Sequence, residues 1–256
     1  MVVPSNYVGA AVAYVSEQLG SAHVPLRRIG EDAVRPLAVT PQARKSLTVL
    51  VVGESARAQN FGLLGYDRDT TPQLSKEAGL VAFSDVHSCG TETAVSVPCM
   101  FSTFTRKQYD ASKARNQEGL LDVLQRAGIA VHWRDNQSGC KGTCDRVAFE
   151  DRFTPVCRSN ALDKCDRQSI INGYDNTLVY TDHVLATLID VLRSRQDKVD
   201  TAMLYLSDHG ESLGEYNLFL HGTPYMLAPE QQKHIPMLAW FSDGYRKDYA
   251  VDTDCL

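Results

Sequence analysis

The sequence predicts an α/β fold in which a mainly parallel sheet is sandwiched between helices. The first observation behind this prediction is the continuous apolar run Leu47–Val52, which is typical of a strand buried on both faces in a parallel sheet. The second is that similar runs alternate along the chain with amphipathic helical stretches, the pattern of a sheet covered by helices. A length of 256 residues fits one such domain with a sizeable core.

The remaining elements follow from hydrophobic periodicity. After Leu47–Val52, the pattern predicts a helix over Gln117–Ala127, followed by a strand over Ile129–Trp133. In the next long helix, apolar side chains recur at steps of three and four and form one buried stripe. That helix and the two last predicted strands span, in order, Gln168–Arg195, Ala202–Leu206 and Ile235–Phe241.

The N-terminal stretch differs from the rest of the chain. Residues 1–44 are expected to form a linker that follows an absent transmembrane region, and residues 45–256 the catalytic domain. The apolar run Tyr7–Val15 is shorter than the roughly 20 residues that a membrane span needs. Its apolar residues have helical spacing, so it is expected to form a short helix that lies either on its own domain or on a membrane surface.

Composition excludes some partners and indicates a compartment. Hydrophobic residues make up 43% of the chain and the formal charge is −5, which argues against a nucleic-acid partner. Seven cysteines are many for a cytosolic enzyme of this size. Disulfides explain their spacing better than a zinc clamp does, so an oxidising compartment is expected. Three pairs and one leftover are predicted: Cys89–Cys99, Cys140–Cys144, Cys157–Cys165 and single Cys255.

Acidic and imidazole side chains stand at the ends of two predicted strands. Glu54 follows the first strand, and Asp208 and His209 follow a later one. Ligands of open α/β sheets sit beyond the carboxyl ends of strands, where these side chains would meet. Carboxylate and imidazole groups are suitable zinc ligands, and three protein ligands leave a fourth position for a reacting oxygen. The alternative is that the Asp-His pair belongs to an ordinary turn.

The segment between Cys89 and Cys99 has the features of a pinned turn that opens into a helix. Its hydroxyls at Thr91 and Thr93 either cap that helix or sit at a helix N-terminus that favours an anion such as phosphate. A free threonine hydroxyl is a poor nucleophile, and metal coordination would lower its pKa.

Two further side chains have both an ordinary and a functional interpretation. Lys141 lies between Cys140 and Cys144, and is either a solvated charge or a fixed point charge for a phosphate. His221 is either a turn residue or a contact of the phosphate or of a second metal.

Several segments, in the same order, resemble the lipid A phosphoethanolamine transferases, including the mobile colistin-resistance enzymes, within the alkaline phosphatase and sulfatase superfamily. The resemblance covers roughly residues 45–245 and implies the fold of that superfamily. The matching segments are Val51–Phe61, Ser88–Phe101, Phe153–Cys157, Tyr174–Asn176, Tyr205–Gly214 and Leu220–Pro224, together with Val147 and the three residues before it.

The resemblance also implies a site and a reaction. Zinc is expected, as one ion or as two. The implied donor is phosphatidylethanolamine and the implied acceptor is a lipid A phosphate. Thr93 is implied as the residue that carries the phosphoethanolamine group between them. The implied zinc ligands are Glu54, Thr93, Asp208 and His209; the implied substrate contacts are Lys141, His221, Gln137 and Glu211, of which Glu211 is also expected to help hold the second metal.

The resemblance implies a location and a consequence as well. The enzyme is expected to be a monomer that works at the membrane surface, on the periplasmic face of a Gram-negative inner membrane. Modified lipid A carries less negative charge, so resistance to colistin and other polymyxins is expected. The chain departs from the family pattern in lacking the membrane helices, an internal segment near residues 147–152 and the family's C-terminal end.

Two alternative functions remain from the sequence. One is a phosphatase or phosphodiesterase of the same superfamily, with water as the final acceptor; the products formed from phosphatidylethanolamine discriminate it from a transferase. The other is a non-enzymatic module stabilised by zinc, in which Thr93→Ala would change nothing except metal affinity.

Overall fold

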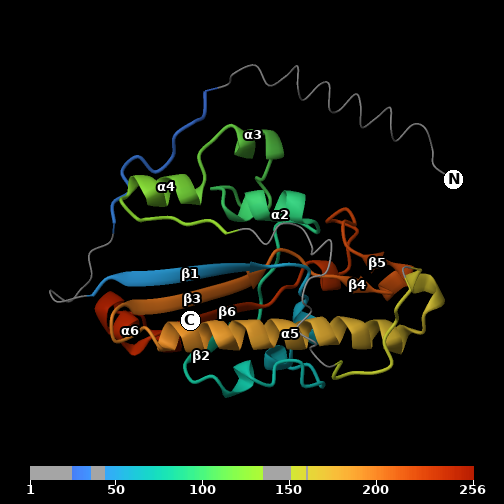
Figure 1. Ribbon diagram of the computed structural model, residues 1–256. Helices are drawn as coiled ribbons and strands as arrows, with labels where there is room; N and C mark the ends of the chain where they lie inside the picture. Colours follow the sequence, from blue (N-terminus) through green and yellow to red (C-terminus); the bar gives the residue numbers. More distant parts are fainter. Residues whose placement is uncertain (1–24, 36–43, 135–150, 160) are drawn as a thin grey trace.

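The computed structural model describes residues 25–35, 44–134, 151–159 and 161–256. The α/β class is confirmed, with a sheet at the centre (Figure 1). Four strands form this sheet in the order β1-β3-β6-β2, and a separate pair, β4 and β5, forms a small hairpin. The strands are β1 (Ser46–Gly53), β2 (Leu80–Phe83), β3 (Asp200–Ser207), β4 (Ser212–Leu213), β5 (Phe219–Leu220) and β6 (Met237–Phe241).

The described sheet is mixed. β1 and β3 run parallel, as expected for the two long apolar runs, whereas β6 is antiparallel to both of its neighbours. The α-helices are α2 (Thr93–Met100), α3 (Ala111–Arg115), α4 (Leu120–Arg126), α5 (Arg167–Arg193) and α6 (Asp243–Tyr249). Short 3-10 helices span Ala58–Asn60, Gly62–Leu64, Leu74–Lys76, Leu162–Lys164, Glu215–Asn217, Glu230–Gln232 and Thr253–Cys255.

Helix α5 covers one face of the sheet and confirms the long predicted helix. It begins after Asp166, whose carboxylate accepts a hydrogen bond from the Ser169 N–H and so caps the first turn. Its apolar stripe packs against the middle of the sheet, because buried side chains of α5 and of β3 belong to one hydrophobic cluster. The fully buried members include Leu178, Leu185, Ile189 and Met203.

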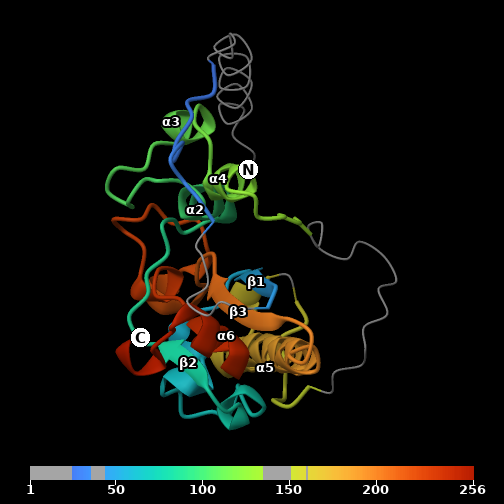
Figure 2. The same ribbon diagram turned by 90° about the vertical axis from the view of Figure 1, so that its left-hand side faces the viewer.

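A second group of helices lies apart from α5. In both views α2, α3 and α4 lie on the side of the molecule where β1 forms the edge of the sheet (Figures 1 and 2). Helix α4 begins three residues later than predicted, because the Asp122 carboxylate caps the Gly119 N–H and sets the first turn there. Among the described residues, no helix is long and apolar enough to cross a membrane.

The strand predicted over Ile129–Trp133 is wrong. These residues keep the alternation of a strand, with Ile129 and Val131 half buried and Ala130 and His132 exposed, but they form no ladder. Trp133 packs edge-on against Phe101, just after α2, with ring centroids 5.7 Å apart. Alternation indicates which side chains are covered, whereas a strand also needs a neighbouring backbone to pair with, and that partner cannot be seen in a local pattern.

The register of β1 and β3 determines where the candidate site forms. Gly53 lies opposite Ser207, so the two parallel strands end side by side. The Asp208 N–H continues the ladder by donating to the Gly53 carbonyl at 2.9 Å. Glu54 and Asp208 therefore leave the sheet next to each other, at its carboxyl edge.

Candidate active site

Thr93 is the first residue of α2, and the loop before it is held from two sides. The Cys89–Cys99 disulfide joins the start of this loop to the end of the helix. The Thr91 hydroxyl donates to the Thr223 carbonyl at 2.7 Å, and the Gly222 N–H donates to the Thr91 carbonyl at 2.8 Å. Neither threonine caps α2, because the N-cap residue is Glu92. The Thr93 hydroxyl is therefore free to point at the strand ends.

Three predicted metal ligands meet at the Thr93 hydroxyl. Its Oγ1 lies 2.7 Å from Asp208 Oδ2, 3.1 Å from Glu54 Oε2 and 3.3 Å from His209 Nε2. The residues come from the end of β1, the start of α2 and the end of β3, segments that are far apart in the sequence. The fold thus brings together all four residues for which the sequence predicts a role in zinc binding.

The chemistry of this group fits a bound cation. A hydroxyl has one proton to donate, yet three acceptors converge on Thr93 Oγ1. Two of these acceptors are carboxylates, and like charges this close repel each other unless a positive charge separates them. Carboxylate oxygens and an imidazole nitrogen are the donor set that zinc takes in catalytic sites.

The site is half inside the protein and half open. Asp208 and His209 are buried, whereas the Glu54 side chain is 64% exposed and Thr93 is exposed. The buried pair is held rigidly, because Asp208 Oδ1 accepts from the Ser55 N–H at 3.0 Å and from the His209 N–H at 2.7 Å. A substrate can approach the Thr93 oxygen from solvent while its anchors stay fixed.

Electrostatic coupling is strong between Glu54 and His209. The hydrogen bond with His209 is the main reason why the pKa of Glu54 falls to about 2. Burial lowers the pKa of His209, but the hydrogen bond to Glu54, the Gly210 carbonyl and the Asp208 charge together outweigh it, so the pKa of His209 is raised. A proton therefore occupies this cluster more readily than it would an isolated imidazole.

His221 and Glu211 form a second pair beside the first group. His221 Nδ1 lies 2.9 Å from Glu211 Oε2, and the ring centroids of His221 and His209 are 4.3 Å apart. Ligand atoms of Glu54, His209 and His221 all lie within 4.8 Å of one another. Glu211 Oε1 is buried without a hydrogen-bond partner among the described residues, which fits a second cation at this pair.

Tyr174 on α5 is a residue near the site for which the sequence alone predicts no role. Its hydroxyl accepts a hydrogen bond from the Arg57 N–H at 2.8 Å and donates one to the Ser55 carbonyl at 2.8 Å. Ser55 has a φ of 58°, a left-handed conformation that is unfavourable for a residue with a side chain. Tyr174 thus holds the strained turn that carries Glu54. The position of Tyr174 in the helical stripe had predicted only packing.

We expect Tyr174→Phe to lower the free energy of unfolding by about 1–3 kcal/mol, because it leaves the Ser55 carbonyl and the Arg57 N–H without a buried partner. Equilibrium urea unfolding measures this change. Tyr216→Phe is the control, since its side chain is 87% exposed. Equal stability of Tyr174→Phe and the wild type would contradict the role of the hydroxyl.

Other predicted residues lie elsewhere. Gln137, Lys141 and the Cys140–Cys144 pair fall outside the described residues, so their predicted roles stay predictions. Cys157 and Cys165 are joined by a disulfide, as expected, just before α5. Cys255 is exposed and forms no disulfide among the described residues.

The site and fold match known proteins. The sulfatase family model matches residues 46–164 and 145–254, and so defines the class of this domain. The soluble domain of lipooligosaccharide phosphoethanolamine transferase A from Neisseria meningitidis superimposes with a TM-score of 0.82 and 37% identity, over 91% of this chain and 86% of that one. The chain belongs to the sulfatase family and, within it, to the phosphoethanolamine transferases.

Curated relatives agree with this membership. Phosphoethanolamine transferase EptA of Escherichia coli K12 is 42% identical over 311 residues, which cover 99% of this chain and 56% of the relative. Phosphatidylethanolamine transferase Mcr-1 of Escherichia coli is 38% identical, over 82% of this chain and 51% of the relative. The chain thus spans about half the length of the curated relatives it matches.

Proposed function

We propose that this domain transfers phosphoethanolamine from phosphatidylethanolamine to a lipid A phosphate, with Thr93 as the transient carrier. The observation that carries the proposal is the convergence of Glu54, Asp208 and His209 on one exposed threonine hydroxyl. The names of the relatives, phosphoethanolamine and phosphatidylethanolamine transferases, indicate that the transferred group is phosphoethanolamine. A relative named Kdo(2)-lipid A phosphoethanolamine 7''-transferase, 26% identical, supports a lipid A acceptor.

Zinc fits the residues present, and Glu54, Thr93, Asp208 and His209 would hold it. When bound, zinc would stabilise negative charge on the threonine oxygen and on the phosphoryl group. The pair His221 and Glu211 is the candidate for a second ion. A structure of the periplasmic domain of EptC from Escherichia coli is described as a complex with zinc; that domain is 20% identical to this chain.

In the first displacement, Thr93 Oγ1 attacks the phosphorus of phosphatidylethanolamine. A bond forms between Oγ1 and phosphorus, and the bond between phosphorus and the glycerol oxygen breaks. Diacylglycerol leaves and takes up a proton, for which His221, paired with Glu211 and open to solvent, is our candidate donor. Because Thr93 is exposed, its proton is released to solvent, and the Asp208 carboxylate stays ionised.

In the second displacement, an oxygen of the lipid A phosphate attacks the same phosphorus. The bond to Thr93 Oγ1 breaks and the threonine regains its proton. Because Thr93 begins α2, the positive end of this helix lies at the transferred phosphoryl group and stabilises its charge. Asp208 and His209 stay buried in both steps, so the geometry around the phosphorus is kept.

The setting of the reaction is part of the proposal. The matched structures include a periplasmic domain of one phosphoethanolamine transferase and an integral membrane form of another. These matches support our proposal that the reaction takes place at the periplasmic face of an inner membrane. Resistance to colistin would follow from the lower negative charge of modified lipid A. We further propose that residues 1–44 are a linker, and that an internal segment near residues 147–152 is shorter here than in EptA. The alignment with EptA runs over 311 residues, more than the 256 of this chain.

Incubation of the zinc-loaded protein with phosphatidylethanolamine and lipid A tests the transfer. Mass spectrometry should find diacylglycerol together with lipid A enlarged by one phosphoethanolamine group. Free phosphoethanolamine with unchanged lipid A would instead identify water as the acceptor and a phosphodiesterase. If neither modified lipid A nor free phosphoethanolamine forms, both activities are refuted.

A further inference from the structure

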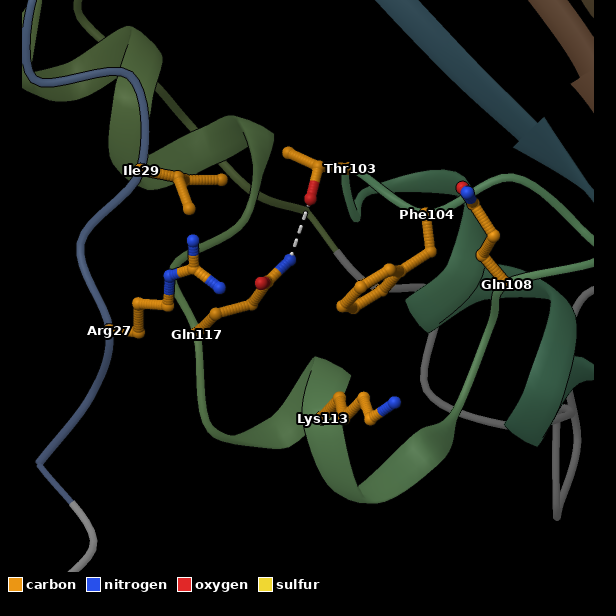
Figure 3. A pocket seen from close by; sticks show the side chains of 7 residues that line it. All are labelled: Arg27, Ile29, Thr103, Phe104, Gln108, Lys113 and Gln117. Carbon is orange, nitrogen blue, oxygen red and sulfur yellow. Dashed lines mark hydrogen bonds between the residues drawn. The ribbon is translucent and has the colours of Figure 1, made fainter.

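A cavity of about 420 Å³ opens on the helical side of the molecule, away from the residues around Thr93. Figure 3 shows that it lies between the segment of Arg27 and Ile29, the loop of Thr103 to Gln108, and helix α3. None of the residues proposed to bind zinc or substrate lines it. The lining residues are Arg27, Ile29, Thr103, Phe104, Gln108, Lys113 and Gln117.

The lining is positively charged and rich in hydrogen-bond donors. Arg27 and Lys113 contribute two cations, and no carboxylate lies among the lining residues. Among the described residues, no carboxylate lies within ion-pair distance of either cation, and the charge of Asp110 acts on Lys113 only at longer range. The Lys113 side chain runs below the ring of Phe104, whereas Arg27 points toward Ile29 and lies beside Gln117 (Figure 3). The amide of Gln108 and the hydroxyl of Thr103 add polar atoms, while Phe104 and Ile29 add apolar wall.

The walls of the cavity are held by backbone pairing. The Arg27 N–H donates to the Asn116 carbonyl at 2.8 Å, and the Glu118 N–H donates to the Arg27 carbonyl at 2.9 Å. Gln117, between these two contacts, is only 9% exposed, and its amide donates to the Thr103 hydroxyl at 2.9 Å. A buried amide joined to the opposite wall means that the polar floor exists before any ligand binds.

We propose that this cavity binds the phosphate group of a phosphorylated lipid, as a holding site separate from Thr93. Arginine and lysine are the side chains that recognise phosphate, and no carboxylate lines the cavity beside them. The amide and hydroxyl groups complete the hydrogen bonds of the phosphate. The apolar wall of Phe104 and Ile29 suits the nearby carbon atoms of a lipid headgroup. The idea that this lipid is the acceptor or the donor of the reaction rests on the proposed function.

Its position fits such a role. Thr103 and Phe104 lie three and four residues after the last residue of α2, and Thr93 begins that helix. Eight residues of α-helix span about 12 Å, so one short rigid element separates the cavity from the reacting oxygen. A lipid held here by one phosphate would stay at the protein while another group reaches Thr93.

Binding to the Thr93→Ala protein tests the cavity without turnover. Inorganic phosphate is titrated by calorimetry after removal of metal by chelation, and flotation is measured with phosphatidylcholine vesicles that contain an anionic phospholipid or lipid A. The double variant Arg27→Gln/Lys113→Gln is compared with the control Arg195→Gln/Lys198→Gln, which removes the same charge from an exposed turn. We expect the first pair to weaken phosphate binding at least tenfold and the control less than twofold.

The phosphate titration and the vesicle assay together distinguish soluble phosphate from a lipid headgroup as the ligand. They also distinguish failure of this site from failure of the proposed function. Loss of both phosphate and vesicle binding in the first pair alone supports a lipid headgroup site. Loss of phosphate binding with unchanged vesicle binding means that the cavity takes soluble phosphate, and overturns the lipid part. Equal effects of the two pairs, or no phosphate binding by the parent, overturn the site. Intact phosphate binding in a protein that transfers nothing would refute the proposed function and leave this site standing.

Discussion

Thr93→Ala should lose phosphoethanolamine transfer by at least ~1,000-fold, since the substitution removes the atom that forms the bond to phosphorus. Other groups around it would remain, because Glu54, Asp208 and His209 are held by their own strands and by contacts with Ser55 and Gly210. The fold should be retained, as Thr93 is exposed and alanine suits a helix start. Release of diacylglycerol and modification of lipid A, followed by mass spectrometry, measure the loss.

Two control variants sharpen this prediction. Thr93→Ser keeps a hydroxyl at the same place and should retain measurable transfer and a covalent adduct. Thr177→Ala removes an exposed threonine hydroxyl that only bonds to the Tyr174 carbonyl on its own helix, and should be fully active. If Thr93→Ala still formed a phosphoethanolamine adduct, the carrier would have to be another residue.

Asp208→Asn should weaken zinc binding by at least ~100-fold, because it removes one negative charge from the buried side of the site while keeping the side chain's shape. Asparagine can still accept from the Ser55 and His209 N–H groups, so the expected defect lies in the metal rather than in the fold. Metal analysis after dialysis against a zinc buffer, with circular dichroism as the check of folding, measures it.

The matched control is Asp197→Asn, which removes the same charge from an exposed turn and should leave zinc binding unchanged. His221→Ala tests the alternative hypothesis, in which His221 rather than Asp208 holds the principal zinc ion. Glu54, His209 and His221 also form a compact group of ligand atoms, so zinc held there would be lost in His221→Ala and kept in Asp208→Asn. That pattern would move the principal ion to the second pair and contradict the proposed ligand set.

Much of the fold was open to prediction, since its longest elements have strong local patterns. The apolar run Leu47–Val52 lies within β1, and the stripe from Gln168 to Arg195 corresponds to α5. Strand direction and pairing were less accessible: β6 was expected from its apolar run, but nothing in five residues specifies that it runs antiparallel to β3. Ile129–Trp133 failed for the same reason, because pairing depends on a distant backbone.

Some residues of the candidate site could likewise be predicted from the sequence, and others could not. Glu54, Asp208 and His209 could be found because they stand at strand ends, where the topology of an α/β sheet collects side chains. Tyr174 could not, since a tyrosine in a helical stripe predicts core packing and its hydrogen bonds to Ser55 and Arg57 depend on the path of β1's end. Arg27 was hidden within an expected linker, because its partners around Asn116 are distant in sequence.

An anomalous difference map recorded at the zinc edge from crystals of the zinc-loaded protein tests the central claim most directly. The proposal predicts a peak at about 2.0–2.2 Å from Thr93 Oγ1, from a carboxylate oxygen of Glu54 and of Asp208, and from His209 Nε2. A fully occupied peak bonded elsewhere, with the Thr93 oxygen outside bonding distance of any metal, would contradict it.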